Sequence, residues 1–278
     1  MKMRQPVAIL TALRQAGFEA WYVGGCVRDT LLGRPVHDWD ITTSALPQQV
    51  LALFGHCVPT GLRHGTVTVL EDGTTAEVTT YRADGAYLDG RHPSQVTFVG
   101  SLAEDLARRD FTVNAMAMDD AGTVVDLYGG QADLAAGLLR AVGEPSRRFG
   151  EDALRMLRAL RFSAQLGFSI EAETSQAIDR CAPLASKLSA ERVRDEVEKA
   201  LLSPRPQAVG EMAARGLLQA FGLTVNRSLS SLAALPPEAA VRWTALCRVY
   251  PELELSTLRL PGRLARDAMA AARINRPA

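Results

Sequence analysis

The feature that most constrains this 278-residue chain is the segment 23–43, VGGCVRDTLLGRPVHDWDITT. Within it, Asp38 and Asp40 alternate with Trp39 and Ile41. Because successive side chains of a β-strand point to opposite faces, we expect both carboxylates to project from one face. Closely spaced carboxylates repel each other, and a divalent cation between them is the usual remedy. Asp38 and Asp40 are therefore predicted metal ligands.

A pair of glycines, Gly24 and Gly25, precedes a short predicted helix that carries Arg28. Glycine lets backbone amides approach a phosphate closely, and the amino end of a helix adds partial positive charge. A phosphate-binding turn beside two metal-binding carboxylates is the equipment of phosphoryl or nucleotidyl transfer. An Asp-x-Asp pattern alone is more typical of a solvated strand end, so the prediction depends on the residues that precede it.

The composition bears on the partners, the redox state and the location that we expect for this protein. Lys plus Arg and Asp plus Glu each total 31, so a nucleic-acid partner would have to meet a local basic surface. The four cysteines form no C-x-x-C pair, which fits a reduced protein. No apolar run approaches the roughly 20 residues of a membrane span, and the amino terminus lacks a signal-peptide core. We expect a soluble cytoplasmic protein with no membrane partner.

The periodicity of apolar residues predicts an α/β region followed by helices. Helices are expected over 6–16, 47–54 and 102–109, and strands over 18–23, 65–70 and 75–81. Asp72-Gly73 is typical of a hairpin turn. On the strand that follows this turn, Glu77 faces away from the core, where a carboxylate is most often simply solvated. Beyond Phe168 we expect a wholly helical chain, with helices over 171–180, 189–202 and 207–221.

Together these motifs resemble the signature of the class II tRNA nucleotidyltransferases, the bacterial CCA-adding enzymes and the related poly(A) polymerases. The resemblance covers about residues 20–200 and includes RRDFTVNAMA (108–117) and EDALR (151–155). It implies an α/β head with a small mixed sheet, the polymerase-β-type nucleotidyltransferase palm, followed by an all-α neck and body. The expected parts are a catalytic head over 1–140, a helical neck over 141–205 and a short body over 206–278 that is a candidate for tRNA contact.

The resemblance also assigns roles to individual residues. Asp38, Asp40 and Glu77 would be catalytic, with Asp38 and Asp40 binding Mg²⁺. The nucleotide-binding residues that it implies are Gly25, Arg28, Arg109, Asp110, Asp152, Arg155, Arg158 and Arg161. Among these, Arg109 would pair with a triphosphate oxygen and Asp110 would accept a hydrogen bond from the ribose 2′-hydroxyl. The loop 84–93 resembles a family loop associated with the change from C to A addition, although His92 replaces an arginine.

Residues 151–162 are expected to form one helix with Asp152 and Arg155 a turn apart on its polar side. An ion pair on a solvated face is the alternative interpretation. By the resemblance, these two side chains recognise the base. Cytosine and adenine each present an amino donor beside a ring acceptor, which complements an accepting carboxylate and a donating guanidinium. Uracil and guanine present the opposite pattern, so the pair would select CTP and ATP without a nucleic-acid template.

The expected reaction is attack of a tRNA 3′-hydroxyl on the α-phosphate of CTP or ATP, with release of pyrophosphate. Two Mg²⁺ ions would lower the pKa of the hydroxyl and neutralise the leaving oxygens. A poly(A) polymerase shares these motifs but often carries basic extensions, and a non-catalytic RNA-binding protein would tolerate loss of a carboxylate. The sequence does not distinguish addition of CCA, CC or A alone, and it does not reveal the oligomeric state.

Overall fold

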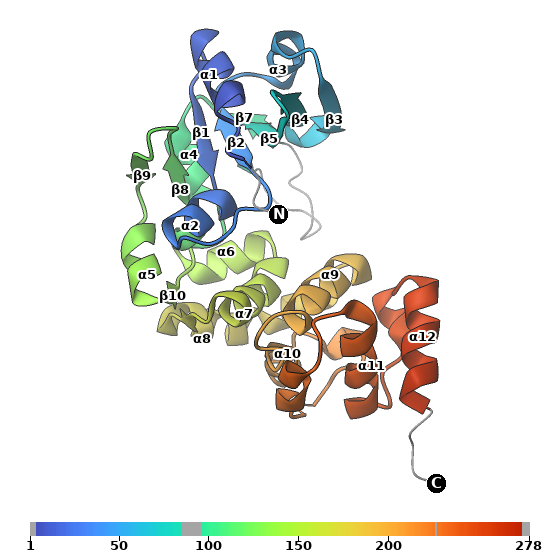
Figure 1. Cartoon of the computed structure of the whole chain (residues 1–278). Coiled ribbons are helices and arrows are strands. Elements are labelled where there is room, and N and C mark those ends of the chain that lie inside the picture. The colour runs from blue at the N-terminus through green and yellow to red at the C-terminus, as the bar shows by residue number, and fades with distance from the viewer. Residues whose placement is uncertain (1–3, 85–95, 226, 274–278) are drawn as a thin grey trace. The chain divides into compact units, whose positions relative to one another are not determined.

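The computed structural model describes residues 4–84, 96–225 and 227–273 (Figure 1). These residues form two compact units. The first contains most of the chain up to Ala136 together with Arg140–Gly143, and the second contains Gly137–Leu139 and the chain from Glu144 onward. The first unit is an α/β domain, whereas the second is almost entirely helical. No helix in the described parts of the chain is long and apolar enough to cross a bilayer.

The first unit is built on a seven-stranded sheet with the order β3-β4-β5-β2-β1-β8-β9. Its strands are β1 (Ala20–Val23), β2 (Asp40–Thr43), β3 (Cys57–Gly61), β4 (Thr66–Glu71), β5 (Thr74–Thr80), β8 (Met116–Met118) and β9 (Val124–Asp126). β2 and β5 pair in parallel, and the other neighbours in this sheet are antiparallel. The predicted mixed sheet is therefore confirmed. A separate hairpin joins β6 (Arg82–Asp84) to β7 (Val96–Phe98).

The hairpin between β4 and β5 sets the position of the second strand beside β2. Asp72 and Gly73 have φ angles of 48° and 68°, the left-handed values that a tight hairpin turn requires. Val67 and Val78 are cross-strand partners on the buried face of the sheet. Because the side-chain period of a strand is two, Glu77 must then face the opposite side.

Helices cover the sheet of the first unit. They are α1 (Val7–Gln15), α2 (Gly25–Leu31), α3 (Pro47–Leu53), α4 (Leu102–Ala107) and α5 (Gly130–Ala136). α1 is amphipathic, and it buries Ile9, Leu10 and Leu13 completely. The segment between α2 and β2 is fixed by Trp39, whose ring packs edge-on against Tyr22 with centroids 4.9 Å apart. This contact orients the residues on either side of Trp39.

The second unit consists of packed helices and one short strand pair. Its elements are β10 (Leu138–Leu139), α6 (Pro145–Glu151), α7 (Leu154–Leu166), β11 (Ser169–Ile170), α8 (Ala172–Cys181), α9 (Ala190–Leu201), α10 (Ala208–Ala214), α11 (Ala239–Val249) and α12 (Gly262–Arg273). The expectation of a wholly helical chain after Phe168 is wrong at β11. The amides of Ser169 and Glu171 donate to carbonyls of residues 137 and 139, so this segment pairs with β10 before α8 begins.

The predicted single helix over 151–162 is also wrong. α6 ends at Glu151 and α7 begins at Leu154. Asp152 lies between them with extended backbone, at φ −146° and ψ 105°. Its Oδ1 accepts a hydrogen bond from the amide of Leu154 at 3.1 Å. An aspartate side chain that bonds a backbone amide two residues ahead favours a turn over a continuous helix.

The first prediction concerns the packing of α5. A Cβ atom at Gly130 would lie 2.3 Å from the carbonyl oxygen of Thr112 and 2.8 Å from a side-chain carbon of Met116. Gly130→Ala should therefore lower the free energy of unfolding by about 1–3 kcal/mol, because the backbone of residue 112 must move. Chemical denaturation monitored by circular dichroism measures this.

Gly55 provides the control, because a Cβ there meets no atom within 4 Å. Gly55→Ala should change stability by less than about 0.5 kcal/mol. Equal effects of the two substitutions would contradict the packing of α5 described here.

Candidate active site

The first unit places three predicted carboxylates near one another. β2 begins at Asp40, and Asp38 lies two residues before the strand rather than in it. Trp39 and Ile41 are buried while Asp38 is exposed, as the alternation predicted. In the parallel pair of strands, Asp40 lies directly opposite Glu77, whose amide donates to the carbonyl of Trp39 at 2.9 Å. The resemblance implied that Glu77 acts together with Asp38 and Asp40, and the strand pairing places Glu77 beside Asp40.

The surroundings of Asp40 disfavour its charged form. Burial raises its pKa to about 6, and the negative charges of Glu77 and Asp38 add to the rise, while Arg109 opposes it. When its surroundings disfavour the charged form of a carboxylate, a nearby cation stabilises that form. The oxygen-only donor set fits Mg²⁺. Within the described ranges, no three His, Cys, Asp or Glu side chains are already gathered around one point.

The double-glycine turn brings an arginine close to Asp40. Gly24 has φ 75° and ψ −133°, and α2 starts directly after it. A Cβ at Gly24 would lie 3.0 Å from Nη1 of Arg109 and 3.8 Å from Oδ2 of Asp40. The absence of a side chain at this position therefore lets the guanidinium group approach the carboxylate of Asp40. Gly25, which was predicted to contact the nucleotide, is the first residue of α2.

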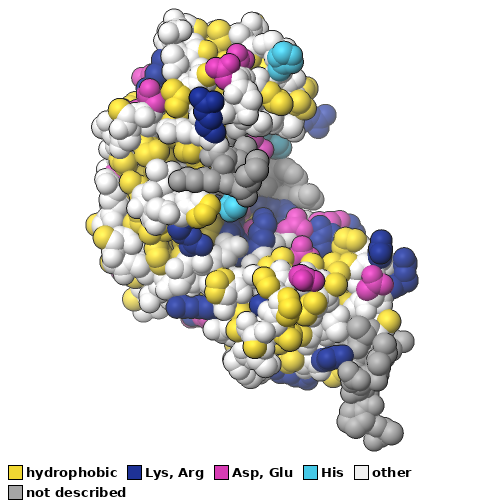
Figure 2. Space-filling view, in the orientation of Figure 1, with side chains coloured by type: hydrophobic (Ala, Val, Ile, Leu, Met, Phe, Trp, Pro, Cys, Tyr) yellow, Lys and Arg dark blue, Asp and Glu magenta, His cyan; other side chains and the backbone are white. Residues whose placement is uncertain are grey.

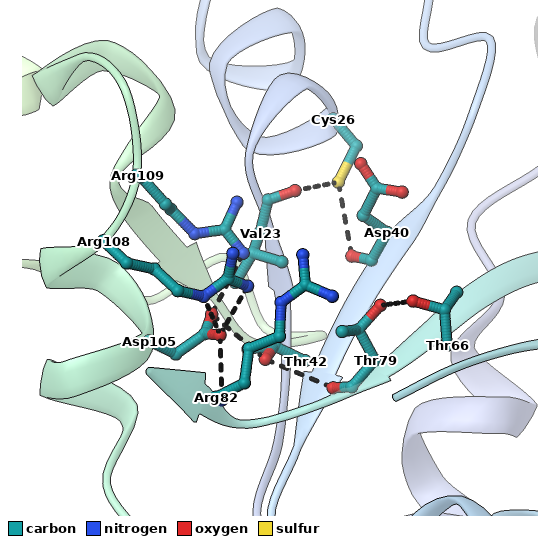
Figure 3. A network of polar contacts seen from close by, with 10 residues as sticks. All are labelled: Val23, Cys26, Asp40, Thr42, Thr66, Thr79, Arg82, Asp105, Arg108 and Arg109. Carbon is teal, nitrogen blue, oxygen red and sulfur yellow. Dashed lines mark hydrogen bonds and ion pairs between the residues drawn. The ribbon is translucent and has the colours of Figure 1, made fainter. Parts of the chain in front are cut away.

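Asp105 is a site residue that the sequence analysis missed. Its side chain is completely buried. Asp105 accepts hydrogen bonds from Nη2 of Arg108 at 2.7 Å and from Nη2 of Arg109 at 3.1 Å (Figure 3). Burial alone would raise its pKa, but the two arginines hold the pKa below the usual range. The spacing was a usable signal, because residues three and four positions after a helical carboxylate lie on its face.

A second network joins Arg28 to Asp110. Arg28 is buried, and its Nη1 donates to Oδ1 of Asn114 at 2.8 Å. The side-chain amide of Asn114 donates in turn to Oδ1 of Asp110 at 3.1 Å. Arg28 also contacts Asp29 at 3.0 Å through both Nε and Nη2. The structure thus links two predicted nucleotide-binding residues through Asn114, which the sequence analysis did not single out.

The second unit carries the predicted base-recognition residues. Oδ2 of Asp152 accepts a hydrogen bond from Nη2 of Arg192 on α9 at 2.7 Å. Arg155 is buried, and its Nη1 donates to Oε2 of Glu151 at 2.9 Å and to the carbonyl of Arg148 at 3.1 Å. Asp152 and Arg155 are therefore not the exposed neighbours on one helix that were expected. The sequence analysis placed Arg192 within the predicted helix 189–202 and gave it no role.

The two remaining predicted arginines differ in environment. Arg161 is buried, forms an ion pair with Glu196, and stacks 3.7 Å from the ring centroid of Phe162. Arg158 is one-third exposed and lies 4.0 Å from Glu196. Arg158 is thus the more accessible of the two. The predicted loop over 84–93, including His92, lies outside the described residues apart from Asp84.

Comparison with known proteins identifies the family. Residues 20–140 match the family described as "Poly A polymerase head domain", and residues 167–223 match "Probable RNA and SrmB- binding site of polymerase A". The CCA-adding enzyme of Geobacillus thermodenitrificans is 45% identical over 278 residues, covering 96% of this chain and 69% of that protein. The chain belongs to the CCA-adding enzyme family.

Other members of the CCA-adding enzyme family agree with this assignment. The enzyme of Leuconostoc mesenteroides is 56% identical over 207 residues, which cover 74% of this chain and 52% of that protein. The chain thus spans about half the length of this relative, and likewise 49% of the Lactiplantibacillus plantarum enzyme. The crystal structure of the Bacillus stearothermophilus CCA-adding enzyme in complex with CTP matches with a TM-score of 0.87 and 41% identity, covering 97% of this chain and 70% of that one.

The geometry at Gly24 yields a second prediction. Gly24→Ala should weaken CTP binding by about tenfold or more, because the new methyl group displaces the guanidinium of Arg109. Isothermal titration calorimetry with CTP measures the affinity. Gly33→Ala is a suitable control, because Gly33 also has positive φ but a Cβ there meets no atom within 4 Å.

Both substitutions should cost roughly 1–3 kcal/mol of stability through backbone strain. Only Gly24→Ala should lose affinity. If both variants bind CTP with the affinity of the parent, Arg109 does not contribute to CTP binding from its position beside Gly24.

Proposed function

We propose that this chain adds CMP, AMP or both to the 3′ end of tRNA, using CTP and ATP without a nucleic-acid template and releasing pyrophosphate. The observation that carries the proposal is the placement of Glu77 directly beside Asp40, two residues after Asp38, with the guanidinium of Arg109 at the glycine turn. The named activity of relatives in the CCA-adding enzyme family supports it, as does the CTP complex of the Bacillus stearothermophilus protein.

In this proposal the carboxylates and the arginines have separate tasks. Asp38 and Asp40 would hold Mg²⁺, which when bound lowers the pKa of an attacking hydroxyl and neutralises leaving oxygens. Glu77, exposed beside Asp40, would orient the RNA 3′-hydroxyl. Arg109 would pair with the triphosphate, since a guanidinium group suits phosphate oxygens. Fixing these groups before the substrates arrive lowers the entropic cost of reaching the transition state.

Base selection in this proposal falls to Asp152 and Arg155. A carboxylate accepts and never donates when ionised, and a guanidinium only donates. Hydrogen bonds fix both side chains. Asp152 accepts from Arg192 and from the amide of Leu154, and Arg155 donates to Glu151. Held in this way, the two groups would present a fixed acceptor and a fixed donor. That pattern complements cytosine and adenine and opposes uracil and guanine.

The test is to incubate the purified chain with tRNA transcripts ending in the discriminator base, in C or in CC. CTP and ATP are supplied separately, and the products are sequenced. Addition that stops at the CCA end supports the proposal and shows which nucleotides are added. Long runs of A on unrelated RNA would instead show a poly(A) polymerase, the activity named in the matching family description. RNA binding without any addition would show a non-catalytic module.

The third prediction concerns the metal-facing carboxylate. Asp40→Asn should reduce nucleotide addition by at least about 10³-fold, because the amide cannot supply the negative charge that holds Mg²⁺. Single-turnover incorporation of labelled CMP measures the rate. Stability should not fall, because the substitution keeps the volume of the side chain and removes a buried charge whose desolvation, with repulsion from Glu77 and Asp38, outweighs its attraction to Arg109. An Asp40→Asn variant that adds nucleotides at the parental rate would remove Asp40 from the proposed site.

The fourth prediction concerns the base. Asp152→Ala should raise incorporation of UMP and GMP relative to CMP and AMP by roughly tenfold, since one base contact is worth about 1–3 kcal/mol. Competition between labelled nucleotides in one reaction measures the ratio. Arg192→Ala serves as the comparison, because it frees one oxygen of Asp152 without removing the acceptor. If Asp152→Ala is as selective as the parent, this carboxylate serves only to pair with Arg192 and cap α7.

A further inference from the structure

We propose that Asp105 is a positioning residue that fixes the guanidinium of Arg109 for the triphosphate of the incoming nucleotide. This inference rests on the function proposed above and adds a residue to it. Asp105 lies on α4, and the aspartates of the metal-binding motif lie on or just before β2. The hydrogen bonds of Asp105 are made with Thr42, Arg82, Arg108 and Arg109, so we expect it to act on the nucleotide through Arg109.

Two carboxylates attract the same guanidinium group. Nη2 of Arg109 is 3.1 Å from Oδ2 of Asp105, and Nη1 lies against Gly24 near Oδ2 of Asp40. Nε of Arg109 is buried and has no hydrogen-bond partner among the described residues. The hydrogen bond to Asp105 is therefore the anchor that determines which way this side chain points. With that anchor, one terminal nitrogen is bound and the other is directed toward the glycine turn.

Asp105 is itself held by groups from several elements. Nε and Nη2 of Arg108 contact Oδ1 at 3.0 and 2.7 Å. Oγ1 of Thr42 on β2 donates to Oδ2 at 3.2 Å, and the amide of Arg82 donates to Oδ1 at 3.4 Å. Figure 3 shows this network gathered around the buried carboxylate. Because Asp105 has no exposed surface, its position is set by packing and does not depend on solvent.

The charges around Asp105 explain why the anchor matters. One buried negative charge faces two arginines, so the group retains net positive charge for a phosphate ligand. Without Asp105, the guanidinium of Arg109 would be drawn to Asp40, the other carboxylate that interacts with it. Arginine would then neutralise a proposed metal ligand and withdraw from the triphosphate. Asp105 thus keeps Arg109 from turning fully toward Asp40.

A double-mutant cycle tests this inference. Asp105→Asn, Arg109→Ala and the double variant are compared for CTP affinity by calorimetry in buffer with EDTA, which separates nucleotide binding from metal-dependent catalysis. Asp105→Asn should weaken CTP binding by about tenfold, the loss expected for a hydrogen bond to a charged group. In the Arg109→Ala background, the same substitution should weaken binding by less than about twofold, because its effect passes through Arg109.

Asp133→Asn is the matched control. Asp133 is also a buried carboxylate of the first unit, and it accepts from Oγ1 of Thr112 at 2.7 Å and Nε of Arg140 at 3.1 Å. Asp133→Asn should lower the free energy of unfolding but leave CTP affinity within about twofold of the parent. Should Asp105→Asn fail to fold, Thr42→Val removes one donor to Oδ2 while retaining all charges, and it should still weaken CTP binding by about threefold.

The outcomes distinguish a failure of the role given to Asp105 from a failure of the proposed function. A parent protein that neither binds CTP nor extends tRNA refutes the proposed function itself. If the parent binds CTP but Asp105→Asn binds equally well, Asp105 has no positioning role. An equal loss in the presence and absence of Arg109, or an equal loss in Asp133→Asn, would show general loosening of the domain and overturn the inference. Parental affinity in Thr42→Val, if Asp105→Asn does not fold, would overturn it too.

Discussion

The parallel pairing of β2 with β5 is the constraint on which the first unit depends. It places Asp40 directly beside Glu77, although the two residues are far apart in sequence. A shift of one residue would turn Glu77 toward the core and bring Val78 to the surface. The tight turn at Asp72-Gly73 specifies the register of β4 with β5, and the buried residues on β5 determine which of its faces carries Glu77. The arrangement of carboxylates is thus maintained by packing on the opposite face of the sheet.

Both units use the same means of holding arginines in place. Asp105 in the first unit is buried against Arg108 and Arg109, and Glu196 in the second is buried beside Arg161 with Arg158 near it. A buried carboxylate with well-made hydrogen bonds contributes little net stability but determines where its partners lie. On the face shown in Figure 2, basic and acidic side chains of the described residues are interspersed. The positive charge that the proposed nucleotide site requires would therefore have to be supplied locally, which agrees with equal totals of acidic and basic residues.

Local patterns predicted β1, β2, β4, β5, most helices and the hairpin turn, because apolar periodicity and turn residues act over short distances. They did not predict β3 or the short strands from β6 onward. The Asp-x-Asp segment and its relation to Glu77 could likewise be predicted, given the resemblance to a known family. Asn114 was missed because its partner Arg28 is remote in the sequence. Asp105 also has a partner remote in the sequence, Thr42, but its spacing to Arg108 and Arg109 was a local signal that went unused. Periodicity also failed at Asp152, where a side-chain hydrogen bond to the backbone outweighed an apolar pattern that continued through the break.

The break at Asp152 matters for the base recognition proposed above, because it orients this side chain in a way that a continuous helix would not. In a continuous helix, the amide of Leu154 would donate to the carbonyl of residue 150, and the Asp152 side chain would point outward as one of several solvated charges. In the observed turn, Oδ1 satisfies that amide and Oδ2 is held by Arg192 from α9. The backbone hydrogen bonds lost at the break are thereby partly offset. The carboxylate gains a fixed orientation, and an orientation fixed by two independent elements is what reading the edge of a base requires.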